Sequence, residues 1–389
     1  MHNQNKIIYF HTVIMDGRLE IHIVSFTIPY PPNYGGVIDI FYKIKWLSNL
    51  GVKINLHCFR YDREQSEELE KYCKSVRYYY RPKKIKHLLS KLPFIVQTRS
   101  NKKLLRILQA DQLPILLEGL HSTYFLKQLA VNQRRIVLRT HNIEHEYYTH
   151  LAKQERNLFK KLFFHSEAKK LLKFEKTLGP DITIAAISEQ DCKYFKSLNP
   201  NTYFIEAFHP NNQIKTLTGL GKYILFHGNL SVIENVIAAL FILNNICSKV
   251  NYPFKFVGKN PPLSLKKRIQ KQSNAELIEN PGNTEMEQLI QNAQINLLIT
   301  FQDTGIKLKL INALYLGRHC IANSKMADNS GLSKLCHIHN TSNQIIENIK
   351  SLYLTPISEV DLTNRREILL KNVNNRHSAQ KLINLLDKK

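Results

Sequence analysis

The chain has 389 residues, and 43% of them are hydrophobic, which favours two folded domains over a single one. No stretch approaches the roughly 20 consecutive apolar residues of a membrane-spanning helix. Lysine and arginine number 55 against 31 acidic residues, so the formal net charge is +24. Composition therefore excludes wholesale disorder and predicts a polyanionic partner, which could be nucleic acid, anionic lipid or a phosphorylated substrate.

The first residues do not resemble an export signal. Residues 6–15 are apolar but short, and no small-residue cleavage site follows them. Residues 1–14 are interpreted as a dispensable extension or a misassigned start. No CxxC pair occurs, so reduced thiols and a cytoplasmic location are expected. The cysteines are Cys58, Cys73, Cys192, Cys247, Cys320 and Cys336.

In the first half, short β-rich runs alternate with longer amphipathic stretches, which predicts a parallel sheet with helices on both faces. A helix is expected at Val37–Leu50, where Gly51 ends it. The expected strands are Glu20–Thr27, Val52–Phe59, Val76–Tyr80, Ile115–Glu118, Ile136–Thr140 and Ile182–Ala186.

A linker is predicted at Asn199–Gly221, where Pro, Asn, Thr and Gly interrupt the alternation. Helices are then expected at Asn235–Cys247 and Lys307–Leu316. The strands of this half are expected at Tyr223–His227, Phe254–Gly258, Leu277–Glu279, Ile295–Thr300 and His319–Ala322. The fold class is therefore α/β, with two Rossmann-like, doubly wound domains at 1–205 and 206–370 and a C-terminal helix at 371–389. In such sheets, ligands bind at the carboxyl ends of the strands.

Glycine turns follow several of these strands. Tyr34, Gly35 and Gly36 close the loop after the first strand, and their backbone amides could approach a phosphate or sugar at the next helix N-terminus. In the second half, Gly228 and Asn229 follow one strand, and Gly258 and Lys259 follow the next. Each turn could present amides to a nucleotide, and the alternative for each is a plain tight turn.

A polar cluster with the sequence HNIEHE follows the strand Ile136–Thr140. His141 and His145 lie four residues apart, but the pattern is not HExxH and lacks a third ligand, so no metal is expected. The cluster fits binding of sugar hydroxyls or proton transfer better. The alternative is that Asn142 and Glu144 only cap the following helix.

The densest signal is the segment 304–317, in which Gly305 opens a helix and Lys307 and Lys309 occupy its first turn. Cations there oppose the helix dipole, so the pattern indicates an anion that docks at this end. Lysine is a workable phosphate ligand, and Asn312, one turn on, could bind a sugar or ribose. The alternative is two solvated lysines on a surface helix.

Taken in order, these segments resemble the retaining nucleotide-sugar glycosyltransferases of the GT-B fold, especially family 4 of bacterial polysaccharide enzymes. Residues 29–36 resemble the acceptor loop, 140–144 the HN-x-E element, and 226–230 the first strand of the donor domain. Residues 305–314 resemble the donor motif G-x-[RK]-x-K-x-x-E-A-[LM], which is the specific one. The resemblance extends from about residue 20 to 330.

The resemblance implies two domains that face a cleft, with the C-terminal helix crossing back to the N-terminal domain. It implies a metal-independent hexosyltransferase that moves a hexose such as mannose from a GDP- or UDP-sugar, with no bound cofactor. His141 would lie by the transferred sugar, while Lys307 and Lys309 would stabilise the departing diphosphate in a front-face displacement. The donor site would comprise Gly228, Asn229, Gly258, Lys259, Thr304, Gly305, Ile306 and Asn312, and the acceptor side Tyr34, Gly35, Gly36, Asn142 and Glu144.

The sequence departs from the family pattern at the donor motif. Asn312 replaces the glutamate that binds ribose, and Thr304 replaces the first acid of the E-x7-E version. The Arg/Lys pair that many members carry is absent from 228–235. Lys307 and Lys309 are therefore expected to carry the phosphate contacts.

The basic residues concentrate at 71–91 and 156–176, and the second segment reads as a basic amphipathic helix with Phe159, Phe163 and Phe164. A glycan or lipid-linked acceptor at an anionic membrane surface accounts for this placement and predicts peripheral attachment to the inner face of the membrane. The alternative classes are a nucleic-acid-binding protein, an epimerase of the same fold, or an inactive relative. No RRM, KH, helix-turn-helix or zinc pattern appears, so nucleic acid is not expected as a partner.

Overall fold

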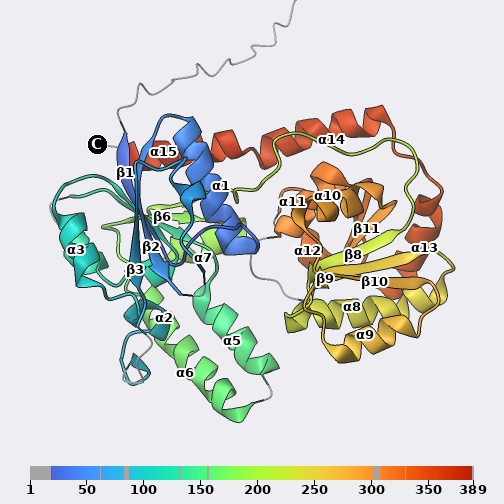
Figure 1. Ribbon diagram of the computed structural model, residues 1–389, viewed down its shortest axis with the longest axis horizontal. Coiled ribbons are helices and arrows are strands. Elements are labelled where there is room, and N and C mark those ends of the chain that lie inside the picture. Colours follow the sequence, from blue (N-terminus) through green and yellow to red (C-terminus); the bar gives the residue numbers. More distant parts are fainter. Residues whose placement is uncertain are drawn as a thin grey trace, which may run out of the picture.

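The computed structural model describes residues 19–61, 63–82, 87–130, 133–155, 157–301, 307–328 and 330–387. These residues form two α/β domains (Figure 1). Several predicted features lie outside the described residues. They are the extension at 1–14, the basic residues Lys83, Lys84, Lys86 and Arg156, and the donor-site residues Thr304, Gly305 and Ile306.

The N-terminal domain is built on a seven-stranded parallel sheet in the order β3-β2-β1-β4-β5-β6-β7. The central strands are buried along their whole length, as expected for a sheet covered on both faces. The strands are β1 (Glu20–Ser25), β2 (Lys53–Arg60), β3 (Ser75–Tyr80), β4 (Ile115–Glu118), β5 (Ile136–Thr140), β6 (Thr183–Ala186) and β7 (Thr202–Phe204).

Helix α1 follows β1 and ends before Gly51, whose φ of 85° lies in the left-handed region that favours glycine. Helices α5 and α6 form a long hairpin that projects from the domain (Figure 1). The helices are α1 (Gly35–Asn49), α2 (Phe94–Gln97), α3 (Lys102–Gln109), α4 (Leu126–Leu129), α5 (Glu144–Gln154), α6 (Leu158–Glu175) and α7 (Glu189–Leu198). Short 3-10 turns occupy Glu67–Leu69 and Leu120–Ser122.

The C-terminal domain repeats this plan on a six-stranded parallel sheet in the order β10-β9-β8-β11-β12-β13. Its strands are β8 (Ile224–Asn229), β9 (Phe254–Lys259), β10 (Ala275–Glu279), β11 (Ile295–Leu298), β12 (His319–Ala322) and β13 (His337–Ile338). Its helices are α8 (Ile233–Asn245), α9 (Leu263–Gln270), α10 (Asn283–Asn292), α11 (Leu308–Leu316), α12 (Ser324–Ala327) and α13 (Ser342–Tyr353), with 3-10 turns at Cys247–Lys249 and Ser333–Leu335.

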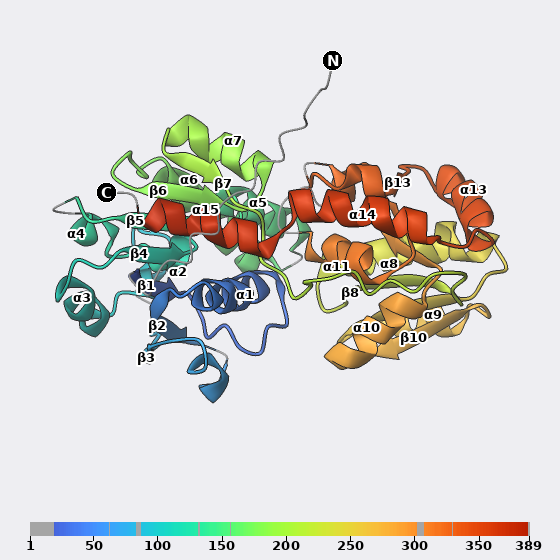
Figure 2. The same cartoon turned by 90° about the horizontal axis from the view of Figure 1, so that it is seen from above.

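The last two helices connect the domains a second time (Figure 2). Helix α14 (Glu359–Asn372) contributes Leu369 to the core of the C-terminal domain. Helix α15 (Asn375–Asp387) contacts α1, and its Leu382 and Ile383 are buried in the N-terminal core. The chain therefore ends on the domain in which it began.

The linker prediction at Asn199–Gly221 is wrong at its start. Helix α7 runs to Leu198, and β7 adds an edge strand at Thr202–Phe204 inside the predicted linker. Asn199 is buried because its side chain donates to the carbonyls of Gly179 and Ile182. Three residues after an Asn-Pro-Asn run are too few for strand periodicity, so only sheet pairing reveals β7.

The described helices include none that combines the length and apolar character needed to cross a bilayer.

Candidate functional site

Residues from both domains line one pocket between them. Ile187 and Ser188 come from the carboxyl end of β6, whereas Lys307 and Leu310 come from the start of α11. Carboxyl ends of parallel strands are where α/β sheets bind ligands. Of the predicted site residues that the structure describes, Lys307 lines this pocket, whereas His141 and Lys309 do not. We call the predicted site residues of the two domains the N-terminal half and the C-terminal half of the candidate site.

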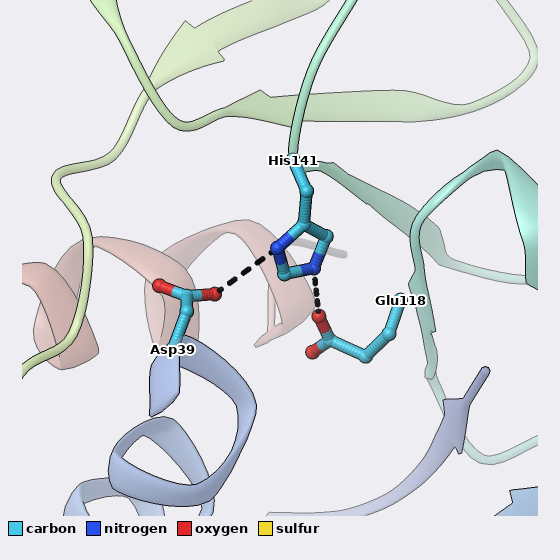
Figure 3. A group of neighbouring side chains, drawn as sticks. All are labelled: Asp39, Glu118 and His141. Atoms are coloured by element: carbon cyan, nitrogen blue, oxygen red, sulfur yellow. Dashed lines mark hydrogen bonds and ion pairs between the residues drawn. The ribbon is translucent and has the colours of Figure 1, made fainter. Parts of the chain in front are cut away.

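The N-terminal half rests on a buried cluster of charged side chains at the ends of α1, β4 and β5. The Lys43 ammonium lies 2.8 Å from Asp39 Oδ2 and 2.7 Å from Glu118 Oε1. Arg139 donates to Asp39 Oδ1 at 3.0 Å. His141 Nε2 lies 3.0 Å from Glu118 Oε2 (Figure 3). Asp39, Lys43, Glu118 and Arg139 are completely buried. We call these four residues and His141 the ion network.

The ion network is neutral when His141 is uncharged, because the carboxylates of Asp39 and Glu118 are balanced by the side chains of Lys43 and Arg139. Burial by itself would raise the pKa of Asp39, but Arg139 and Lys43 outweigh it and hold that pKa below its ordinary value. Burial likewise opposes ionisation of Glu118, yet Lys43 and His141 lower its pKa. Both carboxylates are therefore ionised although they are out of contact with water.

The ion network also holds the start of the interdomain linker. Arg139 donates to the carbonyl of Ile205 at 2.6 Å and to that of Glu206 at 3.1 Å. The backbone N–H of Phe208 donates to Asp39 Oδ1 at 2.8 Å. The same side chains that support His141 thus fix the point where the chain leaves the N-terminal domain.

His141 is held with its ring turned inward. Its Nε2–H donates to the ionised Glu118, and its buried Nδ1 has no hydrogen-bond partner but lies 4.0 Å from Asp39 Oδ2 (Figure 3). A Cβ on Gly36 would lie 3.2 Å from the Phe26 ring and 3.7 Å from His141 Nδ1. Gly36 therefore permits the close approach of α1 to the Phe26 ring, which makes an edge-to-face contact with His141, whereas a Cβ on Gly35 would meet only open space.

The two histidines of the HNIEHE cluster do not converge. His145 Nδ1 lies 2.6 Å from Glu175, on the other side of the turn from Glu118. Asp39, Glu118 and His141 could together offer three metal-ligand atoms within 4.8 Å. However, the Lys43 ammonium already lies between both carboxylates, where a divalent cation would have to bind. The cluster therefore fits an ion network and not a metal site.

Glu144 and Asn142 do not cap α5 in the way the simpler alternative supposed. The N-cap residue is Ile143, which makes no side-chain cap, and the first-turn N–H of His145 donates to Glu175 Oε1 at 3.1 Å instead. Glu144 is buried instead and is hydrogen-bonded by Asn142. Burial, reinforced by Glu175, raises the pKa of Glu144 to about 8, so this carboxyl is protonated at neutral pH.

The acceptor loop lies at the rim of the N-terminal half. Tyr34 is exposed, and the Arg63 guanidinium stacks over its ring at 5.5 Å. Arg63 also donates to the Asn33 side chain at 2.9 Å and to the carbonyl of Tyr30. These groups line a second pocket, so the loop predicted from the sequence is braced by a residue that the sequence did not single out.

In the C-terminal half, the glycine turns are explained by packing. A Cβ on Gly258 would lie 2.0 Å from the Gly228 carbonyl, so β8 and β9 approach closely only because residue 258 is glycine. A Cβ on Gly228 would meet the Asn235 side chain at 3.0 Å. Asn229 and Lys259 end the two strands with exposed side chains.

Lys309 is the under-neutralised cation of the site. Its ammonium donates to Asn235 Oδ1 at 2.9 Å and lies 5.8 Å from the centroid of the Phe226 ring. No carboxylate of the described residues forms an ion pair with it. Burial, with a smaller contribution from Lys307, lowers the pKa of Lys309 to about 8. The alternative of a solvated surface lysine is therefore wrong for Lys309.

Three neighbours, of which Lys307 is cationic, extend this polar environment. His227 is buried and its Nε2 has no partner, and burial followed by Lys309 lowers its pKa to about 3. Lys307 is the N-cap residue of α11, which begins at Leu308, so Lys307 precedes the first turn in which the sequence analysis had placed it. Asn312 accepts a hydrogen bond of 2.8 Å from Asn211 of the linker.

Sequence reasoning missed most of the ion network and the partner of Lys309. A signal was present for Asp39 and Lys43, which lie four residues apart within a mainly apolar stretch. Glu118 and Arg139 end runs of hydrophobic strand residues, where a charge is unexpected. Asn235 gave no signal, because amides are common near helix starts.

Comparison with known proteins places this architecture. No model of a known protein family matches the chain. Over 314 residues it is 26% identical to a Klebsiella pneumoniae protein described as an uncharacterized 44.6 kDa protein in the cps region, which covers 76% of this chain and 80% of that one.

Three solved structures share the fold over almost the whole chain. TarM has a TM-score of 0.65 at 10% identity, covering 96% of this chain and 100% of TarM. WaaG, a glycosyltransferase involved in lipopolysaccharide biosynthesis, has a TM-score of 0.61 at 11% identity, covering 95% and 100%. The trehalose-6-phosphate synthase OtsA has a TM-score of 0.63 at 11% identity, covering 95% and 99%.

These similarities and the two parallel sheets establish the fold as GT-B, the two-domain architecture of many glycosyltransferases. The predicted fold class is thereby confirmed. Sequence identities of 10–11% to these structures show the fold alone, because one fold can carry many activities.

Proposed function

We propose that this protein is a retaining glycosyltransferase that moves a hexose from a nucleotide-diphosphate sugar to a glycan or lipid-linked acceptor in polysaccharide biosynthesis. The observation that carries the proposal is the unmatched charge of Lys309. The half-buried Lys309 ammonium donates to an amide oxygen, lies next to a second lysine and pairs with no carboxylate among the described residues, so an anion that binds there stabilises it. In the donor domain of a GT-B fold, lysines at the start of this helix suggest that the anion is a diphosphate.

The chemistry then follows from charge. As the bond between sugar and diphosphate breaks, negative charge grows on the leaving diphosphate, and Lys307 and Lys309 stabilise it without a proton transfer. We assign the ion network a positioning role, because both nitrogens of His141 are buried and one is hydrogen-bonded to Glu118. Its part is to hold the turn at 141–144 against the acceptor loop.

The comparisons support the substrate class without fixing it. A variant of S. aureus TarM was crystallised with fondaparinux, α-GlcNAc-glycerol and UDP. The Klebsiella relative belongs to a cps region. We propose a GDP- or UDP-sugar as donor, mannose as one candidate hexose, no metal and no bound cofactor. We further place the reaction at the cytoplasmic face of an anionic membrane, where lipid-linked acceptors would be presented.

The proposal is tested by the thermal shift of the purified full chain with UDP, GDP, ADP and single-stranded oligonucleotides. A ligand that binds only the folded state stabilises it by about 2.7 kcal/mol at 100 times its Kd. We expect one nucleoside diphosphate to raise the melting temperature in wild type and not in Lys309→Met. A shift with oligonucleotides and with no nucleotide would favour the nucleic-acid-binding alternative.

The matched control is Lys267→Met, which removes an exposed lysine from α9 in the same domain. It changes net charge by the same amount, so it should keep the nucleotide shift of wild type. Equal loss in both variants would mean that the nucleotide responds to overall charge and not to a site.

A further inference from the structure

The tip of the α5–α6 hairpin exposes large apolar side chains. Leu158, Phe159 and Leu162 are 73%, 85% and 68% exposed. They occupy the first two turns of α6, at positions that share one side of a helix. Folding gains nothing from leaving three such side chains in water.

The other side of the same two turns is packed, so the exposure is not a consequence of a loose helix. Phe163 makes an edge-to-face contact with Phe94, and Phe164 makes one with Tyr148 of α5. Glu167 also holds α6 to the domain, because it accepts from the backbone N–H of Phe94. The outward apolar residues are therefore additional to those that the hairpin needs for its own stability.

The charges of α6 are sorted in the same direction. Its only acidic residues, Glu167 and Glu175, are 1% and 0% exposed. Its fully exposed charged side chains are all lysines, namely Lys160, Lys161, Lys169 and Lys173. At the turn before α6, Glu155 is half-buried and accepts from the backbone N–H of Asn157. The outer surface of α6 is consequently apolar and cationic.

A second apolar projection lies beside α6. Leu89 is 87% exposed, and the neighbouring Leu88 is held to α6 because Lys170 Nζ donates to its carbonyl at 2.9 Å. In Figure 1 this loop and the hairpin extend from the same side of the N-terminal domain. We call Leu89, Leu158, Phe159, Leu162 and the four exposed lysines of α6 the docking surface.

We propose that the docking surface binds an anionic lipid bilayer, with the apolar side chains inserted among the lipids and the lysines at the headgroups. Apolar insertion combined with a row of cations is the chemistry of an interfacial helix. A protein partner with an acidic surface would match the lysines, but protruding side chains on two separate segments suit a deformable lipid surface better than a fixed groove.

The hairpin also links this surface to the candidate site. Helix α5 begins three residues after His141 and has 11 residues, so at ~1.5 Å per residue the tip lies about 16 Å from the root of the hairpin. This step rests on the proposed function, because it explains how an acceptor anchored in lipid could reach the site. Binding of the surface to lipid does not depend on that step.

The test is co-sedimentation of the full chain with phosphatidylcholine vesicles, with and without phosphatidylglycerol. We expect binding to mixed vesicles, release by high salt and little binding to pure phosphatidylcholine. The triple variant Leu158→Ser/Phe159→Ser/Leu162→Ser should bind mixed vesicles at least tenfold more weakly. The double variant Lys160→Glu/Lys161→Glu should weaken binding most at low salt.

The matched control is Leu263→Ser/Leu354→Ser/Val360→Ser, which removes three side chains of similar exposure, 73%, 70% and 78%, from the C-terminal domain. It should bind mixed vesicles like wild type. Unchanged binding by the hairpin variant, or equal loss in the control, would overturn the assignment. Sedimentation velocity adds a further check, because self-association that the hairpin variant abolishes would show that a second copy covers the surface.

The docking proposal and the proposed function fail separately. The thermal shift with nucleoside diphosphates measures nucleotide binding in the absence of vesicles. The hairpin variant should show the same nucleotide shift as wild type. Loss of vesicle binding in the hairpin variant, with an intact nucleotide shift, would identify the hairpin as a membrane element. An intact nucleotide shift without any vesicle binding in wild type would refute the docking proposal and the membrane location, and it would leave the proposed donor site standing.

Discussion

The two halves of the candidate site differ in how their buried charges are balanced. In the N-terminal half, Asp39 and Glu118 are matched by Lys43 and Arg139, and every one of these groups has partners within the domain. In the C-terminal half, Lys309 has an amide acceptor and a lysine neighbour, and no described carboxylate pairs with it. Among the described residues, the charges of one half are balanced, whereas the other half keeps a cation for which we propose an anionic ligand.

This difference separates positioning from binding. A matched buried network contributes little attraction to a ligand, but it fixes the geometry of what surrounds it, since each charge is expensive to leave unpaired. An under-matched cation destabilises the empty protein slightly and attracts an anion strongly. The comparison predicts that substitutions in the two halves have different signatures, with stability lost in one and function lost in the other.

The largest expected effect is on stability in the ion network. Glu118→Gln leaves Lys43 buried with one carboxylate fewer, so the free energy of unfolding should fall by about 3–5 kcal/mol, measured by chemical denaturation. The control Glu347→Gln removes an acid from an exposed pair with Lys350 and should change stability by less than about 1 kcal/mol. Equal effects in both variants would refute the charge-matching argument.

The next effect is on function in the donor half. Lys309→Ala and Lys307→Ala should each lower kcat/KM by about 30- to 1000-fold, or about 2–4 kcal/mol, because each removes a cation from the leaving diphosphate. The ligand-free melting temperature of Lys309→Ala should be equal to or higher than that of wild type. Wild-type turnover in both variants would show that the donor site does not include these lysines.

The two halves should also respond oppositely to pH. Glu144 has a raised pKa of about 8 against an ordinary value of 4.5, so the folded state holds a proton that the unfolded state loses, and stability falls as pH rises through that window. His227 has a lowered pKa of about 3 against 6.5, so its contribution falls as pH drops below 6.5. Each slope is at most about 1.4 kcal/mol per pH unit.

Single substitutions separate these slopes in denaturation curves measured from pH 4 to pH 9. Glu144→Gln should remove the loss of stability between about pH 4.5 and pH 8, which stands alone above pH 6.5, and His227→Gln should remove the loss below pH 6.5, which stands alone below pH 4.5. If Glu144→Gln left the alkaline slope unchanged, the carboxyl would be ionised in the folded protein, and its assigned environment would be wrong.

A smaller effect is expected at Asn312, which belongs to the donor half but is tied to Asn211. Asn312→Ala loses one hydrogen-bonding group and should weaken nucleotide binding by about 0.5–1.5 kcal/mol. Asn312→Glu keeps an acceptor for Asn211 and introduces the glutamate of the donor motif that residues 305–314 resemble, so it should bind the nucleotide as well as wild type or better. Tighter binding by the alanine variant would exclude residue 312 from the donor site.

The smallest expected effect is that of a chelator. Because Lys43 lies where a cation would bind between Asp39 and Glu118, EDTA should leave turnover unchanged. Loss of turnover that a divalent ion restores would contradict this and would make the three clustered ligands a metal site.

Much of the fold was determined by the sequence itself. The predicted strands Ile115–Glu118, Ile136–Thr140 and His319–Ala322 coincide with β4, β5 and β12. These are short apolar runs between turn residues, and central strands of parallel sheets are buried on both faces, so composition alone marks them. The short edge strands β7 and β13 escaped prediction because an edge strand buries less and shows little pattern.

For the candidate site as well, some features were predictable from the sequence and others were not. Sequence order placed His141 directly after β5, and it placed Gly36 and Lys309 at the starts of the helices that follow β1 and β11. The sequence could not show that Asp39 of α1 and Glu118 of β4 meet at His141. Asp39 lies 79 positions before Glu118 and 102 positions before His141 in the chain, so these contacts are fixed only when the sheet assembles. Nor could it show that Lys309 turns inward to Asn235. Local pattern determines which elements form, whereas the partners of a buried charge depend on which elements pack together, and that was decided by the tertiary structure.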